Sequence, residues 1–210
     1  FLPVPGAQAS EERGKDMEII MATGNRNKVR EISEMLKDTD LKVISMKDAG
    51  IDIDIVEDGT TFEENARRKA EAVRDACGQV VIADDSGLEI DYLGGEPGIH
   101  SARFMGEDTS YTIKNAALIR SLKGVPDEQR SARFVCAMAI AYPDRETVVF
   151  RGVFEGRIAY EPAGENGFGY DPIFYLPERG CTSAELSPDE KNAISHRGKA
   201  LRMTVDALLR

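Results

Sequence analysis

The hydrophobic pattern of the chain changes its period about halfway, and this change limits the folds that the sequence can adopt. Before residue 125, short apolar runs alternate with segments whose apolar residues recur at helical spacing. After residue 130, two long strand-like segments flank Pro143-Asp144, as in an antiparallel hairpin. The expected strands are 18–23, 41–45, 80–83, 131–142, 146–154 and 173–176, and the expected helices are 28–36, 61–77, 109–122 and two C-terminal helices separated by a break near residue 195. The pattern predicts an α/β domain with a central mixed sheet flanked by helices, and a second lobe built on the hairpin with a cleft between the lobes.

The length of 210 residues suits one domain with a sizeable core. Residues 1–16 (FLPVPGAQASEERGKD) contain two prolines and no periodicity, so we expect a disordered extension or a cloning remnant there and a single domain over 17–210. No apolar run approaches the roughly 20 residues that a membrane span needs. Residues 1–16 also lack the apolar segment of a signal peptide, so we expect no membrane partner.

The charge and the cysteines exclude several classes of function. The formal net charge is -10, from 27 basic and 37 acidic side chains, whereas a nucleic-acid-binding protein usually has a basic surface. We therefore expect no nucleic-acid partner, and an anionic ligand would need local cations or a metal ion. The three cysteines are far apart in the sequence and odd in number, which indicates reduced thiols in a cytoplasmic protein.

Two adjacent carboxylates follow the apolar run Val80–Ala83 and precede a predicted Ser-Gly turn. Because Asp84 and Asp85 repel each other, a divalent cation or a shared proton would stabilise the pair at neutral pH. Oxygen ligands beside a turn are typical of magnesium or manganese sites. The alternative is that the two acids cap the next element and face water.

A polar turn, TGNRNK over residues 23–28, connects the first strand to the first helix. This junction gathers free backbone N–H groups at the positive end of a helix, which suits phosphate, and Lys28 adds a cation. The alternative is an ordinary capped turn.

On the second helix, Asn65 and Lys69 are one turn apart and share a face. Glu57 precedes that helix and is either a metal ligand or part of a turn.

The C-terminal third carries two further candidate segments. The glycine loop GFGYDP over residues 167–172 permits close approach of a ligand, and Phe168 could stack on a base or be buried in the core. Lys191, His196 and Arg197 lie around the helix break and supply several hydrogen-bond donors. A lone histidine such as His196 is more often structural than functional, but the adjacent Arg197 and the nearby Lys191 favour a functional role.

Six motifs occur together in a fixed order: TGNxxK at 23–28, ENAxxKA at 64–70, DDSGLEID at 84–91, LGGxPGxxSAR at 93–103, GFGYDP at 167–172 and SHRGKAL at 195–201. Over nearly all of residues 17–210, the chain thereby resembles the inosine/xanthosine triphosphate pyrophosphatase family. The resemblance implies an elongated, two-lobed α/β fold and a cytoplasmic homodimer. It also implies Mg²⁺-dependent hydrolysis of the purine nucleotides ITP, dITP and XTP to the monophosphate and pyrophosphate, which clears deaminated purines from the nucleotide pool.

The resemblance also implies a role for each site residue. Asp85 is expected to be the general base and a metal ligand, with Glu57 as the second metal ligand. The expected substrate contacts are Thr23, Gly24, Asn25, Arg26, Asn27, Lys28 and Lys69 for the triphosphate, Ser86 for the nucleotide, and Phe168, Gly169, Tyr170, Asp171, Lys191, His196 and Arg197 for the nucleobase. Asp84 is expected to be a supporting group without an assigned role. His100 departs from the family pattern, in which an aromatic residue is expected.

Overall fold

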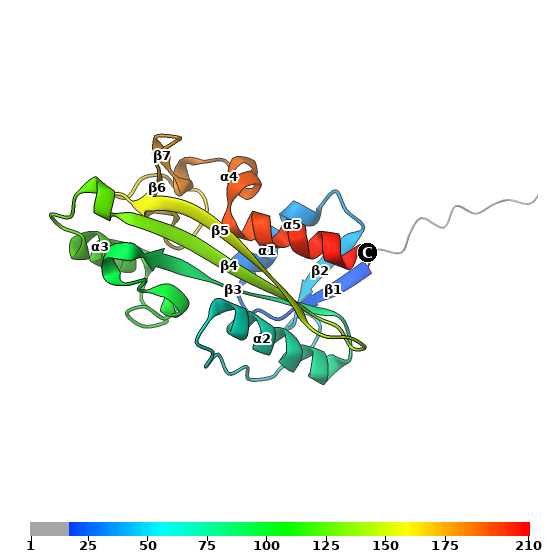
Figure 1. The fold of residues 1–210 in the computed structure, drawn as a ribbon. Coiled ribbons are helices and arrows are strands. Elements are labelled where there is room, and N and C mark those ends of the chain that lie inside the picture. The colour runs from blue at the N-terminus through cyan, green and yellow to red at the C-terminus, as the bar shows by residue number, and fades with distance from the viewer. Residues whose placement is uncertain (1–16) are drawn as a thin grey trace, which may run out of the picture.

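A computed structural model describes residues 17–210, and the expected extension 1–16 lies outside the described residues. The described chain forms one seven-stranded sheet with helices on both faces (Figure 1). The strands are β1 Met17–Met21, β2 Leu41–Ser45, β3 Val81–Ile90, β4 Ser131–Ala141, β5 Val148–Ile158, β6 Phe174–Leu176 and β7 Cys181–Thr182. The helices are α1 Arg26–Leu36, α2 Phe62–Cys77, α3 Tyr111–Ser121, α4 Pro188–Ile194 and α5 His196–Leu208, with 3-10 turns that include η2 Gly98–His100 and η4 Asp171–Ile173.

The sheet is mixed, as the change of period predicted. Its strand order is β2-β1-β3-β4-β5-β6-β7, in which β1 is parallel to both β2 and β3, and every later pair is antiparallel. The long strands β3, β4 and β5 run the length of the molecule and give it the expected elongated shape (Figure 1). Within residues 17–210, no helix is both long and apolar enough to cross a membrane.

The predicted turn at Ser86-Gly87 is wrong, because β3 continues through both residues to Ile90. Asp84 and Asp85 therefore lie in the middle of a buried strand, where Asp85 pairs with Ala137 of β4. Gly87 allows a close approach rather than a turn. A Cβ atom at Gly87 would lie 2.3 Å from the carbonyl oxygen of Gly98, so η2 can pack directly on the strand only because this residue is glycine.

Side-chain caps fix where the helices begin. Asn25 caps α1, which begins at Arg26, two residues earlier than expected, and Thr61 caps α2 as predicted. Glu64 does not complete the expected capping box, because its carboxylate accepts hydrogen bonds from Thr60 instead. The predicted break between the C-terminal helices is confirmed: Ser195 ends α4 and caps α5 with one backbone conformation.

The two faces of the central strands pack against different helices (Figure 1). Helix α2 covers one face through Phe62, Ala66, Ala70 and Val73, and the strands meet it with the small side chains Ala83, Ala137 and Ala139. Helices α1 and α5 cover the other face, where Ile32, Leu36 and Leu201 contact Ile82 and Met138. A third apolar cluster, which includes Leu118 and Phe174, stabilises the end of the sheet near α3. These elements surround the middle of β3, which carries the paired acids.

Candidate active site

A cleft of about 790 Å³ opens beside β3, and its walls come from α1, α2, α3, α5 and the GFGYDP loop. Most residues that the sequence predicted for the site line this cleft, although they come from five separate segments. They are Thr23, Gly24, Asn25, Lys28, Glu57, Lys69, Asp85, Ser86, Phe168, Gly169, Tyr170, Asp171, Lys191, His196 and Arg197. Arg26 and Asn27 are exposed and do not line the cleft.

The N-terminus of α1 forms one end of the cleft. The side chain of Asn25 accepts hydrogen bonds from the backbone N–H groups of Asn27 at 3.0 Å and Lys28 at 3.3 Å, so these two amides are already satisfied. The positive end of the helix still favours an anion there. Lys28 Nζ lies 2.9 Å from an oxygen of Asp84, which holds the lysine at the cleft wall.

Asp85 lies beside Lys69 and Glu57 at the centre of the cleft. Lys69 Nζ is 3.3 Å from a Glu57 oxygen and 3.7 Å from an Asp85 oxygen, so both carboxylates face the same cation. Burial raises the pKa of Asp85, and Lys69 and Lys28, which favour its charged form, do not cancel this effect. Burial would lower the pKa of Lys69, but Asp85 and the neighbouring acids outweigh it and raise the pKa.

Asn65 orients Asp85, and the sequence did not assign Asn65 to the site. Its side-chain amide donates to an Asp85 oxygen at 3.1 Å, while its own carbonyl accepts from the backbone N–H of Gly59 at 2.8 Å. Asn65 is buried on the face of α2 that carries Lys69. The spacing of four residues already placed Asn65 on the same face as Lys69, but it did not reveal Asp85 as the partner of Asn65.

The donors around Glu57 and Asp85 fit a small divalent cation. Across residues 17–210, no group of three or more His, Cys, Asp or Glu side chains converges as an all-protein metal site would require. Mg²⁺ is usually held by one or two carboxylates together with water and substrate phosphates, and Glu57 and Asp85 are two carboxylates that face the same part of the cleft. A second oxygen of the neighbouring Asp84, Oδ1, is buried without a hydrogen-bond partner among the described residues.

Asp84 connects the two ends of the cleft. One of its oxygens lies 2.9 Å from Lys28 Nζ and 3.7 Å from Arg197 Nε, and it accepts a hydrogen bond from Ser86 Oγ at 3.0 Å. Burial alone would raise the pKa of Asp84, but Lys28 and Arg197 hold it well below its usual range. Asp84 is therefore a permanent anion that fixes two cations, a role distinct from that of Asp85.

Glu31 on α1 is a functional candidate that the sequence did not reveal. Its carboxylate pairs with the guanidinium of Arg197 and lies 3.3 Å from Lys191 Nζ. Burial would raise the pKa of Glu31, but Arg197 and Lys191 lower it. Its only signal in the sequence was its position one helical turn after Lys28.

The GFGYDP loop is held by its own acid. Asp171 accepts hydrogen bonds from the backbone N–H of Phe168 at 2.9 Å, from Ser183 Oγ at 2.9 Å and from Lys191 Nζ at 2.8 Å. Tyr170 is buried and donates its hydroxyl to a backbone carbonyl at 2.6 Å. Asp171 and Tyr170 thus fix the loop, and Phe168 is the half-buried aromatic residue with a ring that a base could contact.

His196 presents an uncharged imidazole to the cleft. Its ring stacks on Phe134 with a centroid distance of 4.8 Å. Burial, reinforced by Arg197 and Lys191, lowers the pKa of His196 well below 6.5. Its Nδ1 atom is buried without a hydrogen-bond partner in the described part of the chain, so a ligand could complete its hydrogen bonding.

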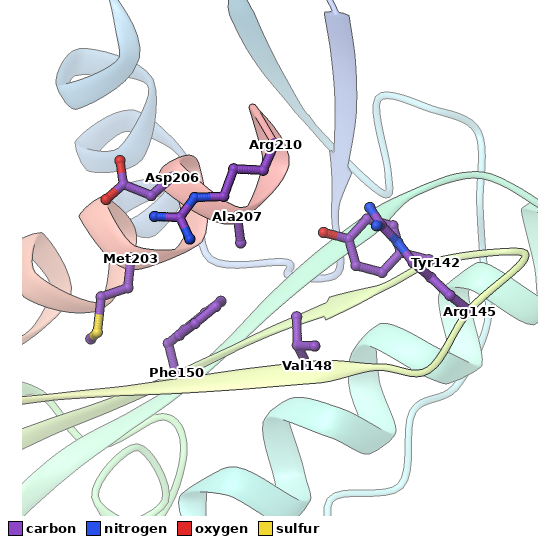
Figure 2. A pocket seen from close by; sticks show the side chains of 8 residues that line it. All are labelled: Tyr142, Arg145, Val148, Phe150, Met203, Asp206, Ala207 and Arg210. Carbon is purple, nitrogen blue, oxygen red and sulfur yellow. The ribbon is translucent and has the colours of Figure 1, made fainter.

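A second hollow, of about 360 Å³, lies between α5 and the end of the β4–β5 hairpin (Figure 2). Figure 2 shows Val148 and Phe150 of β5 on one side of it and Met203, Asp206 and Ala207 of α5 on the other. It contains no residue that the sequence predicted for the site. The cleft beside β3 is therefore the candidate active site.

Comparison with known proteins agrees with this geometry. A model of the Ham1 family matches residues 19–207. The dITP/XTP pyrophosphatase of Geobacillus kaustophilus is 54% identical over 184 residues, covering 88% of this chain and 90% of that protein. The dITP/XTP pyrophosphatase of Bacillus subtilis is 51% identical over 185 residues, covering 88% of this chain and 93% of that protein.

Solved structures show the same fold. The Staphylococcus aureus Ham1 protein superposes with a TM-score of 0.82 at 44% identity, covering 91% of this chain and 98% of that one. The nucleoside-triphosphatase, or dITP/XTP pyrophosphatase, of Mycobacterium abscessus superposes with a TM-score of 0.72 at 42% identity, covering 90% of this chain and 98% of that one. On the evidence of its sequence, its fold and the residues gathered in its cleft, the chain belongs to the Ham1 family.

Proposed function

We propose that this protein hydrolyses the deaminated purine nucleoside triphosphates ITP, dITP and XTP to the monophosphate and pyrophosphate. One observation carries the proposal: a single cleft contains cations for a phosphate chain, two carboxylates beside one of these cations, and an aromatic and imidazole wall for a base. The Geobacillus and Bacillus relatives are named dITP/XTP pyrophosphatases, which supports dITP and XTP as substrates.

In the proposed reaction, a water molecule attacks the α-phosphorus. Its oxygen bonds to that phosphorus, the bond to the bridging oxygen breaks, and pyrophosphate leaves with the electron pair. Asp85 accepts the proton of the water, and burial raises the pKa of its carboxylate in the metal-free protein, which makes it a better proton acceptor. Asn65 keeps the carboxylate of Asp85 in place, and Lys69 and Lys28 stabilise the charge that develops on the phosphate oxygens.

We propose Mg²⁺ as the cofactor, with Glu57 and Asp85 as its protein ligands. When bound, the ion neutralises charge on the phosphate oxygens. The oxygen-only donor set favours Mg²⁺ over zinc, which prefers histidine and cysteine ligands.

Recognition of the base follows from the polar groups that the fold leaves available. The 6-oxo group of hypoxanthine or xanthine accepts hydrogen bonds, and donors at that end of the cleft would lose their partners with an adenine 6-amino group. An unpaired buried donor costs about 1–3 kcal/mol. Both terminal nitrogens of Arg197 already donate to Glu31 and Ser86, so Arg197 supports the pocket wall, while His196 retains an unpartnered nitrogen among the described residues.

Product analysis tests the proposal. Purified protein with Mg²⁺ and ITP should yield IMP and pyrophosphate in equal amounts, and chromatography of the nucleotide with a pyrophosphate-specific assay measures both. IDP and orthophosphate as the products would refute it, and so would ITP that stays intact. A panel of ITP, dITP, XTP, ATP, GTP and dUTP at equal concentration tests the substrate class. The homodimer and the cytoplasmic location remain predictions from the family resemblance.

A further inference from the structure

The ammonium group of Lys114 on α3 is buried without a counter-ion. The described chain has three buried lysines, and two of them each contact two carboxylates: Lys69 contacts Glu57 and Asp85, and Lys191 contacts Glu31 and Asp171. Lys114 is 1% exposed and forms no ion pair within residues 17–210. Its Nζ donates one hydrogen bond, of 2.7 Å, to the backbone carbonyl of Ala102, although an ammonium group has three donors.

Its surroundings do not neutralise this charge. The centre of the Tyr111 ring lies 4.9 Å from Nζ, and this cation–π interaction with a neutral group is weak. Burial lowers the pKa of Lys114, and Glu107 opposes this effect only in part. A buried charge without a partner is unfavourable, so the position of Lys114 in the wall of the cleft indicates that an anion compensates it in the working protein.

The position of Lys114 identifies the anion. Lys114 lines the same cleft as Lys28 and Lys69, but it belongs to the α3 wall, whereas they belong to α1 and α2. Its acceptor Ala102 is followed by Arg103, whose guanidinium lies 3.5 Å from the backbone carbonyl of Glu57. The segment next to Lys114 thus reaches the backbone of Glu57, and the side chain of Glu57 faces Lys69 at the phosphate end of the cleft.

We propose that Lys114 is a third lysine of the phosphate-binding site and contacts the pyrophosphate part of the nucleotide, the part that leaves. The inference rests on the proposed function and adds a residue from the α3 wall. With Lys28 and Lys69, Lys114 encloses the phosphate chain from three elements. The competing explanation is that Lys114 only fastens the segment around Ala102 to α3.

The test compares Lys114→Met with Lys123→Met, in which an exposed lysine just beyond α3 is changed in the same way. Methionine keeps most of the buried stem and removes the charge. Calorimetric titrations with pyrophosphate and, separately, with IMP are done in the presence of Mg²⁺. We expect pyrophosphate to bind Lys114→Met about tenfold more weakly than wild type, or weaker still, because a charge-assisted hydrogen bond is lost. The affinity of Lys114→Met for IMP should stay within about twofold of wild type, since IMP lacks the pyrophosphate part that Lys114 is proposed to contact. Lys123→Met should bind both ligands as wild type does.

Thermal denaturation without ligand separates the two explanations. Our proposal predicts that Lys114→Met melts at or above the wild-type temperature, because an uncompensated buried charge has been removed. A fastening role predicts a lower melting temperature. Unchanged pyrophosphate affinity in a folded variant would overturn the proposal, and so would a failure of both Lys114→Met and Lys114→Gln to fold. If wild-type protein binds pyrophosphate through Lys114 but leaves ITP intact, the proposed function fails and the Lys114 assignment stands.

Discussion

Replacement of Glu31 by glutamine tests whether the base end of the cleft depends on one buried carboxylate. Glu31 is the acid shared by Arg197 and Lys191, and its side chain is only 12% exposed. Glutamine has nearly the same shape, so the change removes a charge without creating a cavity. Both cations would then lie buried with fewer counter-charges.

The structure sets the expected size of the effect. Loss of one partner of a buried ion pair costs about 3–5 kcal/mol when the other charge is left without compensation. Here each cation retains a second acid, since Lys191 lies 2.8 Å from Asp171 and Arg197 lies 3.7 Å from Asp84. We therefore expect Glu31→Gln to lower the free energy of unfolding by about 2–3 kcal/mol, less than the loss of a sole partner would cost.

Urea denaturation followed by circular dichroism measures this loss, and Glu34→Gln on the same helix is the control. Glu34 pairs with Lys37 at 2.7 Å, but both side chains are 53% exposed, so the control should lose less than about 0.5 kcal/mol. The effect of Glu31 should also depend on pH. Its pKa is lowered below 4.5 in the folded state, so its stabilisation is present above the unfolded pKa and is lost as pH falls through the folded pKa. The gap between wild type and Glu31→Gln should shrink over that acidic range.

Equal losses for Glu31→Gln and Glu34→Gln would contradict the reasoning. So would a difference between wild type and Glu31→Gln that grows as the solution is acidified. Either result would mean that the buried pairs around Arg197 do not stabilise the folded state as their geometry indicates.

Two further predictions concern strand β3. Asp85→Asn should fold and bind ITP but lose about 10²–10⁴-fold in kcat, and near-normal turnover would remove Asp85 from the role of base. Because burial raises the pKa of Asp85 in the metal-free protein, its carboxyl group should titrate above the range of a solvent-exposed aspartate, and an NMR titration without Mg²⁺ measures this. Gly87→Ala should lower the free energy of unfolding by about 1–3 kcal/mol, because its Cβ atom would lie 2.3 Å from the carbonyl oxygen of Gly98. Gly24→Ala, where nothing lies within 4 Å of the added atom, should be close to neutral in the same denaturation experiment and is the matched control.

The sequence alone determined the fold class and most members of the site. Apolar periodicity gave the helices and the long hairpin, because each element must bury one face. The polar cap at Thr61 sets where α2 begins, because capping depends on neighbouring residues. The six motifs in one order indicated the family and the cleft residues, without giving their mutual contacts.

Only the tertiary structure decided the path of β3 and the partners of the charged groups. Ser86 and Gly87 were expected to form a turn because local sequence propensity favours one. That propensity contains no information about η2, which is distant in the sequence and packs in the space over Gly87. Asp84 and Asp85 were adjacent and chemically alike in the sequence. Neighbouring side chains on a strand point to opposite faces of the sheet. In the folded protein Asp84 therefore contacts Lys28 and Arg197, whereas Asp85 contacts Asn65 and Lys69.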